Sequence, residues 1–332
     1  MSLRPVLLQI LSAPLGRLPS YRAGCIYKEW KMKTRPIACT FAAILTTLSF
    51  GCSSPKATAT QFLGAPSSIG NGTVASYAEL DATGAPQAIG MVFAGGALDA
   101  LPTAPSDGHH CFDTNKDDKI DVATECSQWH ERVLPIPSEL SSRADIPFKW
   151  AMLNWNPNGH PPPGVWDKPH FDFHFYIEPI ENIFSLQRGT CGPEFMRCDQ
   201  FALAIKPVPK NYVPANYQDA QVAAPAMGNH MIDPTGHEFH GQEFKRHWIF
   251  GIYDAKIIFY EEMVALSYLK SKPDECLPIP ATPAVAIAGY YPTKSCIRYQ
   301  ADKGQTTISM EGFVLRQASP PEPPSAVSAG KP

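Results

Sequence analysis

Seven residues near the middle of the chain, His-Phe-Asp-Phe-His-Phe-Tyr at 170–176, alternate polar and aromatic side chains with a period of two. Because successive side chains of a β-strand point to opposite faces, this pattern predicts a strand with its three phenylalanines on one face. The other face would carry a row formed by His170, Asp172 and His174. Burial of imidazole and carboxylate groups is costly unless they are paired or bound to a metal ion, so this row is the first candidate for a functional site.

Imidazole and carboxylate groups are common protein ligands of zinc, iron and other transition metals. Neighbours on one strand face lie roughly 6–7 Å apart, so Asp172 could share an ion with either His170 or His174. The two histidines themselves would lie roughly 13 Å apart, which strains a single site. We therefore expect two of the three residues to act together, joined by His160 or His230 from outside the strand.

Two loop regions supply the other candidate ligands. A proline-rich loop at 156–164 carries His160, and proline restricts its backbone. A turn-rich segment at 228–240 carries His230 and Asp233. The predicted ligands of a transition metal such as zinc or iron are therefore His160, His170, Asp172, His174, His230 and Asp233.

Two interpretations without a metal stay open for the polar row. The histidines and the aspartate could form a hydrogen-bonded network that fixes a loop against the sheet. A His–Asp pair could also serve in acid–base catalysis. The sequence contains no G-x-S-x-G motif and no Gly-rich phosphate loop, so no activated nucleophile accompanies the pair.

A second type of cation site is indicated at 113–121, which reads D-x-N-x-D-x-x-I-D and matches positions 1, 3, 5, 8 and 9 of an EF-hand loop. Calcium prefers oxygen ligands, which alternate along such a loop. The predicted calcium ligands are Asp113, Asn115, Asp117, Asp121 and the carbonyl group of Lys119. The loop departs from the pattern at position 6, which is Asp118, and at position 12, where Glu125 comes one residue late. The alternative is a surface turn rich in Asp and Asn.

Six of the nine cysteines fall into near pairs downstream of residue 52. Local pairing is the simplest of the fifteen possible connectivities. The predicted disulfides are Cys111–Cys126, Cys191–Cys198 and Cys276–Cys296. No C-x-x-C spacing is present, so these thiols are poor candidates for a metal site, and disulfides indicate an oxidising compartment.

The N-terminal region reads as an export signal. Residues 1–31 are basic without a clear pattern, and we expect them to be an upstream extension that precedes the true start at Met32. Residues 32–52 contain a charged segment, an apolar run and Gly51-Cys52, an arrangement that resembles a bacterial lipoprotein signal peptide. Such a signal implies that Cys52 is lipidated. The alternative is an ordinary secretory signal in which Cys52 has no role.

The remaining chain divides by composition. Residues 53–70 are rich in Ser, Ala, Thr, Pro and Gly, and we expect a flexible tether. We expect a single β-rich domain at 71–318, with the calcium-type loop as an insertion at 111–126. Residues 319–332 contain mostly Pro, Ser and Ala and are expected to form a disordered tail.

The chain contains 34 Pro and 23 Gly, which argues against long helices. We predict a mainly β fold, an antiparallel sheet or a barrel-like, cupin-like domain, with short helices and long Pro-rich loops. Of the 28 basic and 31 acidic residues, seven basic and one acidic residue lie in the first 51 positions. The remaining 21 basic and 30 acidic residues give 52–332 a net charge of -9, which argues against nucleic acid as a partner.

Local patterns place the individual elements of this fold. Alternation and turn residues predict strands at 73–80, 88–93, 131–136, 148–155, 170–176, 247–253, 256–260, 294–300 and 306–316. The strands 247–253 and 256–260 should form a hairpin through Asp254-Ala255. Short helices are expected at 180–187 and 263–269.

Four motifs in this order, at 159–166, 170–176, 228–234 and 251–254, resemble a bacterial family of unknown function typified by the TTHB-two-ten-like proteins of Thermus. The resemblance covers roughly residues 85–270 and includes a calcium-type insertion between the first two predicted disulfide partners. It implies that the six predicted metal ligands fall on the motifs of the family, whereas His237, His240 and His247 do not. The resemblance implies no activity, because the family has none assigned.

The expected function is that of an exported cell-envelope lipoprotein, anchored to the bacterial membrane by its lipid and facing the periplasm or the cell surface. It would bind a metal or a small ligand without turnover. One alternative is a metal-dependent hydrolase or oxygenase that uses the strand at 170–176. Another is a structural envelope protein in which calcium and disulfides hold the loops. Pairing through a sheet edge would give a homo-oligomer, and the sequence identifies no ligand.

Overall fold

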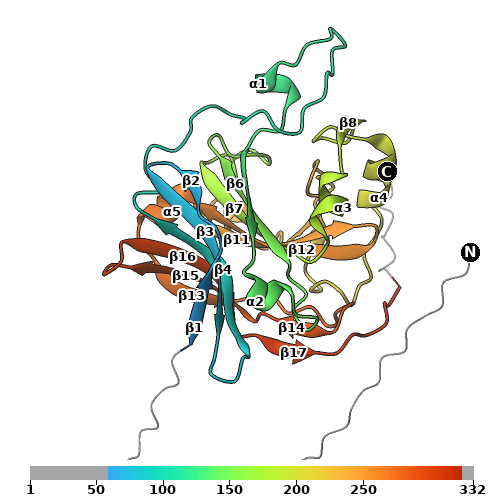
Figure 1. The fold of residues 1–332 in the computed structure, drawn as a ribbon. Helices are drawn as coiled ribbons and strands as arrows, with labels where there is room; N and C mark the ends of the chain where they lie inside the picture. The colour runs from blue at the N-terminus through green and yellow to red at the C-terminus, as the bar shows by residue number, and fades with distance from the viewer. Residues whose placement is uncertain (1–58, 324–332) are drawn as a thin grey trace, which may run out of the picture. The chain divides into compact units, whose positions relative to one another are not determined.

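The computed structural model describes residues 59–323, which form mainly antiparallel β-strands with a few short helices (Figure 1). One sheet, sheet A, has the strand order β1-β3-β4-β16-β15-β13, and β2 pairs with β3. Its strands are β1 (Thr60–Leu63), β2 (Ser67–Ile69), β3 (Gly72–Leu80), β4 (Pro86–Ala94), β13 (Asp274–Pro278), β15 (Lys294–Gln300) and β16 (Gln305–Glu311). The predicted mainly β, antiparallel class is confirmed.

The second sheet, sheet B, has the order β5-β6-β7-β12-β11-β10-β9. Its strands are β5 (His130–Pro135), β6 (Trp150–Asn156), β7 (His170–Tyr176), β9 (Gln218–Asp219), β10 (Asn229–Ile232), β11 (Arg246–Tyr253) and β12 (Lys256–Ala265). A further two-stranded sheet pairs β14 (Gly289–Tyr291) with β17 (Val314–Arg316). The predicted strand at 170–176 therefore lies inside sheet B, between β6 and β12.

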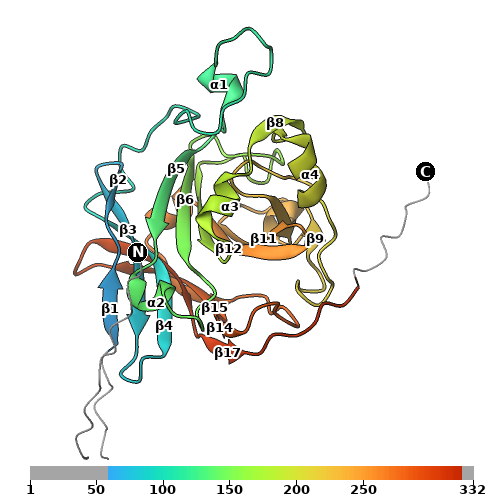
Figure 2. The ribbon, with the colours of Figure 1, turned by 45° about the vertical axis from the view of Figure 1, so that its right-hand side comes forward.

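Short helices and one short strand lie in the segments between the sheet strands. They are α1 (Val122–Glu125), α2 (Ser138–Ser141), α3 (Ile180–Phe184), β8 (Arg188–Cys191), α4 (Cys198–Ala204), the 3-10 helix η1 (His237–His240) and α5 (Leu266–Lys270). Figure 2 shows α3, α4 and β8 on the side of sheet B away from the blue strands of sheet A. This covering layer buries the second face of sheet B.

The two sheets pack against each other through the aromatic face of β7. Phe171, Phe173 and Phe175 are buried in one cluster with side chains from β4, β15 and β16 of sheet A. The ring of Phe93 on β4 lies 5.2 Å from that of Phe171 and 5.8 Å from that of Phe173. The prediction that the phenylalanines face a core is confirmed, and the polar row consequently faces the covering layer.

The opposite face of sheet B carries a second apolar cluster beside the polar row. Trp150 on β6 and Tyr176 on β7 are stacked with their rings 3.9 Å apart. They pack with Ile183 of α3, Ala204 of α4 and residues 223–227. Both faces of β7 are therefore buried, one against sheet A and the other beneath the covering layer.

The predicted hairpin agrees closely with the structure, whereas a predicted helix begins later than expected. The hairpin of β11 and β12 turns through Asp254 and Ala255, whose φ angles are 47° and 62°. Two consecutive positive φ angles are typical of the tight turns that join antiparallel strands. The segment 263–265, expected to be helical, instead extends β12, and α5 begins at Leu266. Pairing with β7 keeps these residues extended.

Three expectations about larger units need correction. Residues 60–69, assigned to the tether at 53–70, form β1 and β2 and pair with β3, because backbone pairing at an edge needs no apolar pattern. The start of the tail is also anchored, since Tyr212 donates a hydrogen bond of 2.7 Å to the carbonyl group of Ser319. No barrel closes within residues 59–323, because sheet A ends at β1 and β13 and sheet B ends at β5 and β9, so the sheets pack face to face instead.

All three predicted disulfides, Cys111–Cys126, Cys191–Cys198 and Cys276–Cys296, are present. The first closes the calcium-type loop, and the second joins β8 to α4 in the covering layer. The third joins β13 to β15 at directly opposite positions. Three disulfides indicate folding in an oxidising, exported environment.

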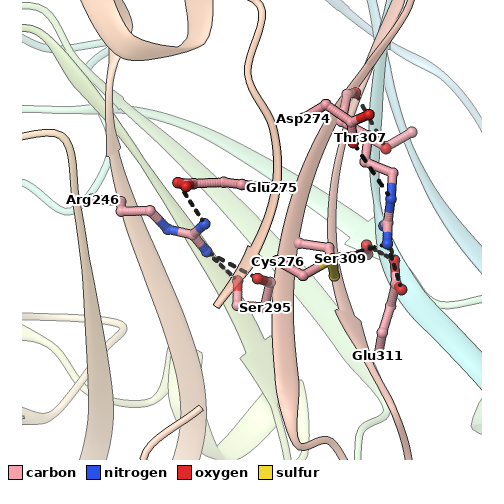
Figure 3. Close-up of a disulfide and its surroundings, with 10 residues drawn as sticks. Arg246, Asp274, Glu275, Cys276, Ser295, Thr307, Ser309 and Glu311 are labelled. Atoms are coloured by element: carbon pink, nitrogen blue, oxygen red, sulfur yellow. Dashed lines mark hydrogen bonds and ion pairs between the residues drawn. A yellow bond between two sulfur atoms is a disulfide. The ribbon is translucent and has the colours of Figure 1, made fainter. Parts of the chain in front are cut away.

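Polar contacts near the third disulfide tie the two sheets together, as Figure 3 shows. Arg246 on β11 of sheet B donates hydrogen bonds to Glu275 at 3.3 Å and to the Ser295 hydroxyl at 2.9 Å, both on sheet A. Its Nε also donates to Glu262 at 2.7 Å. This buried arginine therefore neutralises a glutamate of β12 while it bridges the sheets.

Among residues 59–323, no helix is long and apolar enough to cross a membrane. The predicted upstream extension at 1–31, the signal peptide at 32–52 and the lipidation site Cys52 lie outside the described residues.

Candidate metal centre

The covered face of sheet B gathers polar side chains from adjacent strands. In the antiparallel ladder, Asn154 of β6 lies opposite Asp172, and Glu261 of β12 lies opposite His174. Directly opposite residues project to the same face of a sheet, so both join the polar row of β7. Asn154 and Glu261 were absent from the predicted ligands.

Three of the predicted ligands form one compact group, called the Asp172 triad: His160, His170 and Asp172. Each offers one ligand atom, and these atoms lie within 4.8 Å of one another. His170 Nε2 lies 3.2 Å from one carboxylate oxygen of Asp172, and His160 Nε2 lies 3.9 Å from the other. The expectation that His160 joins the strand pair is met by this geometry.

A second group, called the Glu261 triad, consists of His174, His230 and Glu261, whose ligand atoms also lie within 4.8 Å of one another. His174 Nε2 lies 3.6 Å from a carboxylate oxygen of Glu261. Asp233, which was predicted in this role, belongs to neither triad. Its carboxylate accepts hydrogen bonds from Thr235, within the turn that follows β10, and from Asn216, which precedes β9.

The backbone orients every imidazole of the two triads. Each Nδ1 lies near a main-chain carbonyl oxygen, and the pairs are His160 with Pro161 at 2.9 Å, His170 with Lys168 at 2.7 Å, His174 with Met152 at 3.4 Å and His230 with Val222 at 2.7 Å. A carbonyl oxygen can only accept, so Nδ1 carries the hydrogen and the Nε2 of a neutral ring presents a lone pair. This orientation by a second hydrogen bond is typical of metal-binding histidines.

Buried atoms of both triads lack hydrogen-bond partners among the described residues. These atoms are His170 Nε2, Asp172 Oδ1, His174 Nε2 and Glu261 Oε2. In the neutral form of either ring, Nε2 points a lone pair at a carboxylate oxygen, which is repulsive unless a proton or a cation lies between the two atoms. A transition-metal ion accepts electron pairs from both atom types and would satisfy them together.

The electrostatic setting favours neutral rings for His174 and His230 and the carboxylate form of Asp172, but it favours the protonated form of Glu261. Burial lowers the pKa of His174 to about 4 and also lowers the pKa of His230, so both rings are neutral at pH 7. Burial opposes ionisation of Asp172, but the adjacent His170 imidazole outweighs it and the net pKa lies below its ordinary value. Burial and the neighbouring Asp172 charge raise the pKa of Glu261. No Lys or Arg of the described residues pairs with either carboxylate.

The loop before β7 holds His160 over the row. Gly159 has a φ of 68°, and a Cβ there would lie 2.2 Å from the carbonyl oxygen of Trp166, so this position requires glycine. The His160 N–H donates to the same carbonyl group at 3.1 Å. The His160 side chain is 35% exposed and the other two ligands of its triad are buried, so the Asp172 triad reaches solvent past His160.

The remaining histidines of the turn-rich segment lie apart from the triads. His237 and His240 are exposed on η1. His247 is buried and its Nδ1 pairs with Glu238, which gives it a partner of its own. A third group of potential ligand atoms, Cys276, Cys296 and Glu311, is excluded as a metal site because its sulfurs form a disulfide.

The calcium-type loop has the expected backbone shape. Asp118 has a φ of 62°, the left-handed conformation that glycine adopts at position 6 of an EF-hand loop. Asp113 accepts hydrogen bonds from the backbone of Lys116 at 2.6 Å and Asp118 at 2.8 Å. Glu125 accepts from the backbone of Asp121 and Thr114, and these bonds lower its pKa to about 2. The carboxylates thus hold the loop closed, and the loop's predicted calcium ligands are not among the grouped ligand atoms found in residues 59–323.

Comparison of the chain with protein-family models, curated proteins and solved structures gave no match.

Glu261 predicts an unusual pH dependence for the metal-free protein. Its pKa is raised in the folded state, so above its unfolded pKa the folded protein binds more protons than the unfolded one. The free energy of unfolding should therefore fall as pH rises. Glu261→Gln removes this titration, so after treatment with a chelator the variant should match wild type at pH 5 and exceed it at pH 9. The expected difference is about 1–3 kcal/mol, the usual cost of an unsatisfied buried group.

The measurement is urea denaturation at both pH values, with Glu139→Gln, a change of an exposed glutamate on α2, as the matched control. A Glu261→Gln variant that loses stability with pH in parallel with wild type would contradict the assignment of the buried charge.

Proposed function

We propose that this protein is an exported metal-binding protein whose Asp172 triad holds a transition-metal ion. The observation that carries the proposal concerns His170 Nε2 and Asp172 Oδ1, which are buried 3.2 Å apart. Neither atom has a hydrogen-bond partner among the described residues. His170 Nδ1 donates its hydrogen to the carbonyl oxygen of Lys168. A neutral His170 ring therefore has no hydrogen on Nε2 to donate to Asp172. A cation supported by His160 takes the place of that hydrogen.

The ligand set limits the identity of the ion. Two imidazole nitrogens and one carboxylate oxygen suit zinc and iron, whereas magnesium and calcium prefer oxygen ligands alone. Asp172 Oδ2 is held by a 2.7 Å hydrogen bond from Asn156, which leaves Oδ1 for the ion. A zinc or iron ion bound by three protein groups retains at least one free coordination position.

Turnover is the second candidate function, because His160 is partly exposed and a free coordination position would face solvent beside it. Two histidines and one carboxylate also form the ligand set of iron oxygenases and of zinc hydrolases. However, four cavities among the described residues are lined by side chains outside both triads. This favours binding of the ion itself over turnover of a bulky substrate.

Elemental analysis tests the metal proposal directly. Protein exported to an oxidising compartment and purified without a histidine tag should contain stoichiometric zinc or iron. The variants His170→Ala and Asp172→Asn should each lose about one equivalent, because each removes a ligand of a three-ligand site. His240→Ala, which changes an exposed histidine outside the triads, should retain the wild-type content.

Wild-type protein without transition metal would overturn the proposal. Folded His170→Ala and Asp172→Asn proteins with unchanged metal content would overturn it as well. Retention of all three disulfides and an unchanged circular dichroism spectrum would show that the variants are folded.

We also propose that the loop at 113–121 binds calcium in a structural role, supported by the left-handed Asp118 and the disulfide that closes the loop. Calcium at about 100 times its Kd should raise the free energy of unfolding by about 2.7 kcal/mol. Asp113→Ala should abolish this gain, and Asp302→Ala, at an exposed site elsewhere, should keep it. Thermal denaturation with calcium and with chelator measures the effect, and an equal gain in Asp113→Ala would count against the loop.

We further propose that Cys52 carries a lipid that anchors the protein to the bacterial membrane. The three disulfides support export. Cys52→Ser should move the protein from the membrane fraction to the soluble fraction of cells, because the lipid would be its membrane anchor. An unchanged membrane fraction for Cys52→Ser would refute the anchor.

A further inference from the structure

We propose that the Glu261 triad binds a second divalent transition-metal ion, so that the covered face of sheet B holds a pair of ions. This inference rests on the proposed function, because it adds a second ion beside the one at the Asp172 triad. His174 and Glu261 come from adjacent strands, and His230 comes from β10 on the far side of β11. The three ligand atoms lie within 4.8 Å of one another.

Two consecutive glutamates on β12 differ in whether a positively charged group lies beside their carboxylates. Glu261 and Glu262 are each only 2% exposed, and they point to opposite faces of sheet B. Glu262 receives a 2.7 Å hydrogen bond from the guanidinium group of Arg246. Within the part of the chain that the structure describes, Glu261 has no such cation, and its Oε2 is unpartnered while it faces His174 Nε2. A metal ion at this triad would do for Glu261 what Arg246 does for Glu262.

The spacing of the triads separates the two ions. Asp172 and His174 are alternate residues of one strand, so their attachment points are roughly 6–7 Å apart. Each triad has its own carboxylate and its own pair of imidazoles, and neither shares a ligand with the other. A single ion cannot use both sets, whereas two ions can lie side by side along β7.

Asn154 is a further buried polar group on the same face of sheet B, beside the Asp172 triad. It lies opposite Asp172 on β6, two residues after Met152, which lies opposite His174. Its side chain is fully buried, and neither its amide oxygen nor its amide nitrogen has a partner among residues 59–323. An amide oxygen is a good ligand for a hard cation, so the unpartnered Asn154 opposite Asp172 is a candidate further ligand at the Asp172 triad.

Metal counting on single and double variants tests the inference. The exported protein, stripped with chelator and reloaded with zinc, should bind about two ions per chain, one for each triad. His230→Ala and Glu261→Gln should each reduce the count by about one, and so should His170→Ala, since each removes a ligand of one triad. The double variant His170→Ala/Glu261→Gln should bind close to none.

His230 is only partly buried and Gln matches the size of Glu, so at least one of these variants should fold, as circular dichroism would verify. His240→Ala is the matched histidine control. A wild-type count of one that falls in His170→Ala but not in His230→Ala or Glu261→Gln would overturn the second ion and leave the proposed function intact. A wild-type count of zero would overturn both.

Discussion

β7 is buried on both of its faces, and this constraint shapes the rest of the structure. Its three phenylalanines pack against sheet A, where the ring of Phe93 contacts two of them. The opposite face carries imidazole and carboxylate groups under a covering layer. Because the side-chain period of a strand is two, a shift of one residue would place histidines in the aromatic core. The apolar packing of the phenylalanines therefore fixes the positions of the polar side chains on the opposite face of β7.

The two triads combine rigid and loop-borne ligands in different proportions. The Glu261 triad takes all three ligands from strands of sheet B. The Asp172 triad takes two from β7 and the third, His160, from a loop that depends on the positive φ of Gly159. Strand positions vary little, whereas loops move more readily. The Glu261 triad thus consists of three fixed side chains, whereas the Asp172 triad contains one side chain that could adapt if an ion entered.

Much of this arrangement could be predicted from the sequence, because it depends on local patterns. The alternation at 170–176 gave the strand and its two faces, and short spacing gave the three disulfides. Glu261 could not be found this way, since its place opposite His174 depends on the pairing of strands far apart in the chain. Two glutamates within the apolar run of β12 were the available signal. Asp233 lies outside both triads, and its carboxylate bonds to Thr235, as turn residues often bond to neighbours in the chain.

The four imidazoles donate hydrogen bonds to main-chain carbonyl groups, so their orientation does not depend on neighbouring side chains. Where a side chain orients a metal ligand, one substitution can rotate the ring or alter its tautomer. Here the acceptors are backbone atoms of Pro161, Lys168, Met152 and Val222, which every amino acid possesses. Neighbouring side chains can therefore be exchanged, by drift or by design, without loss of the tautomer that exposes Nε2. The properties of the centre can then be tuned through its apolar surroundings while its ligands stay in place.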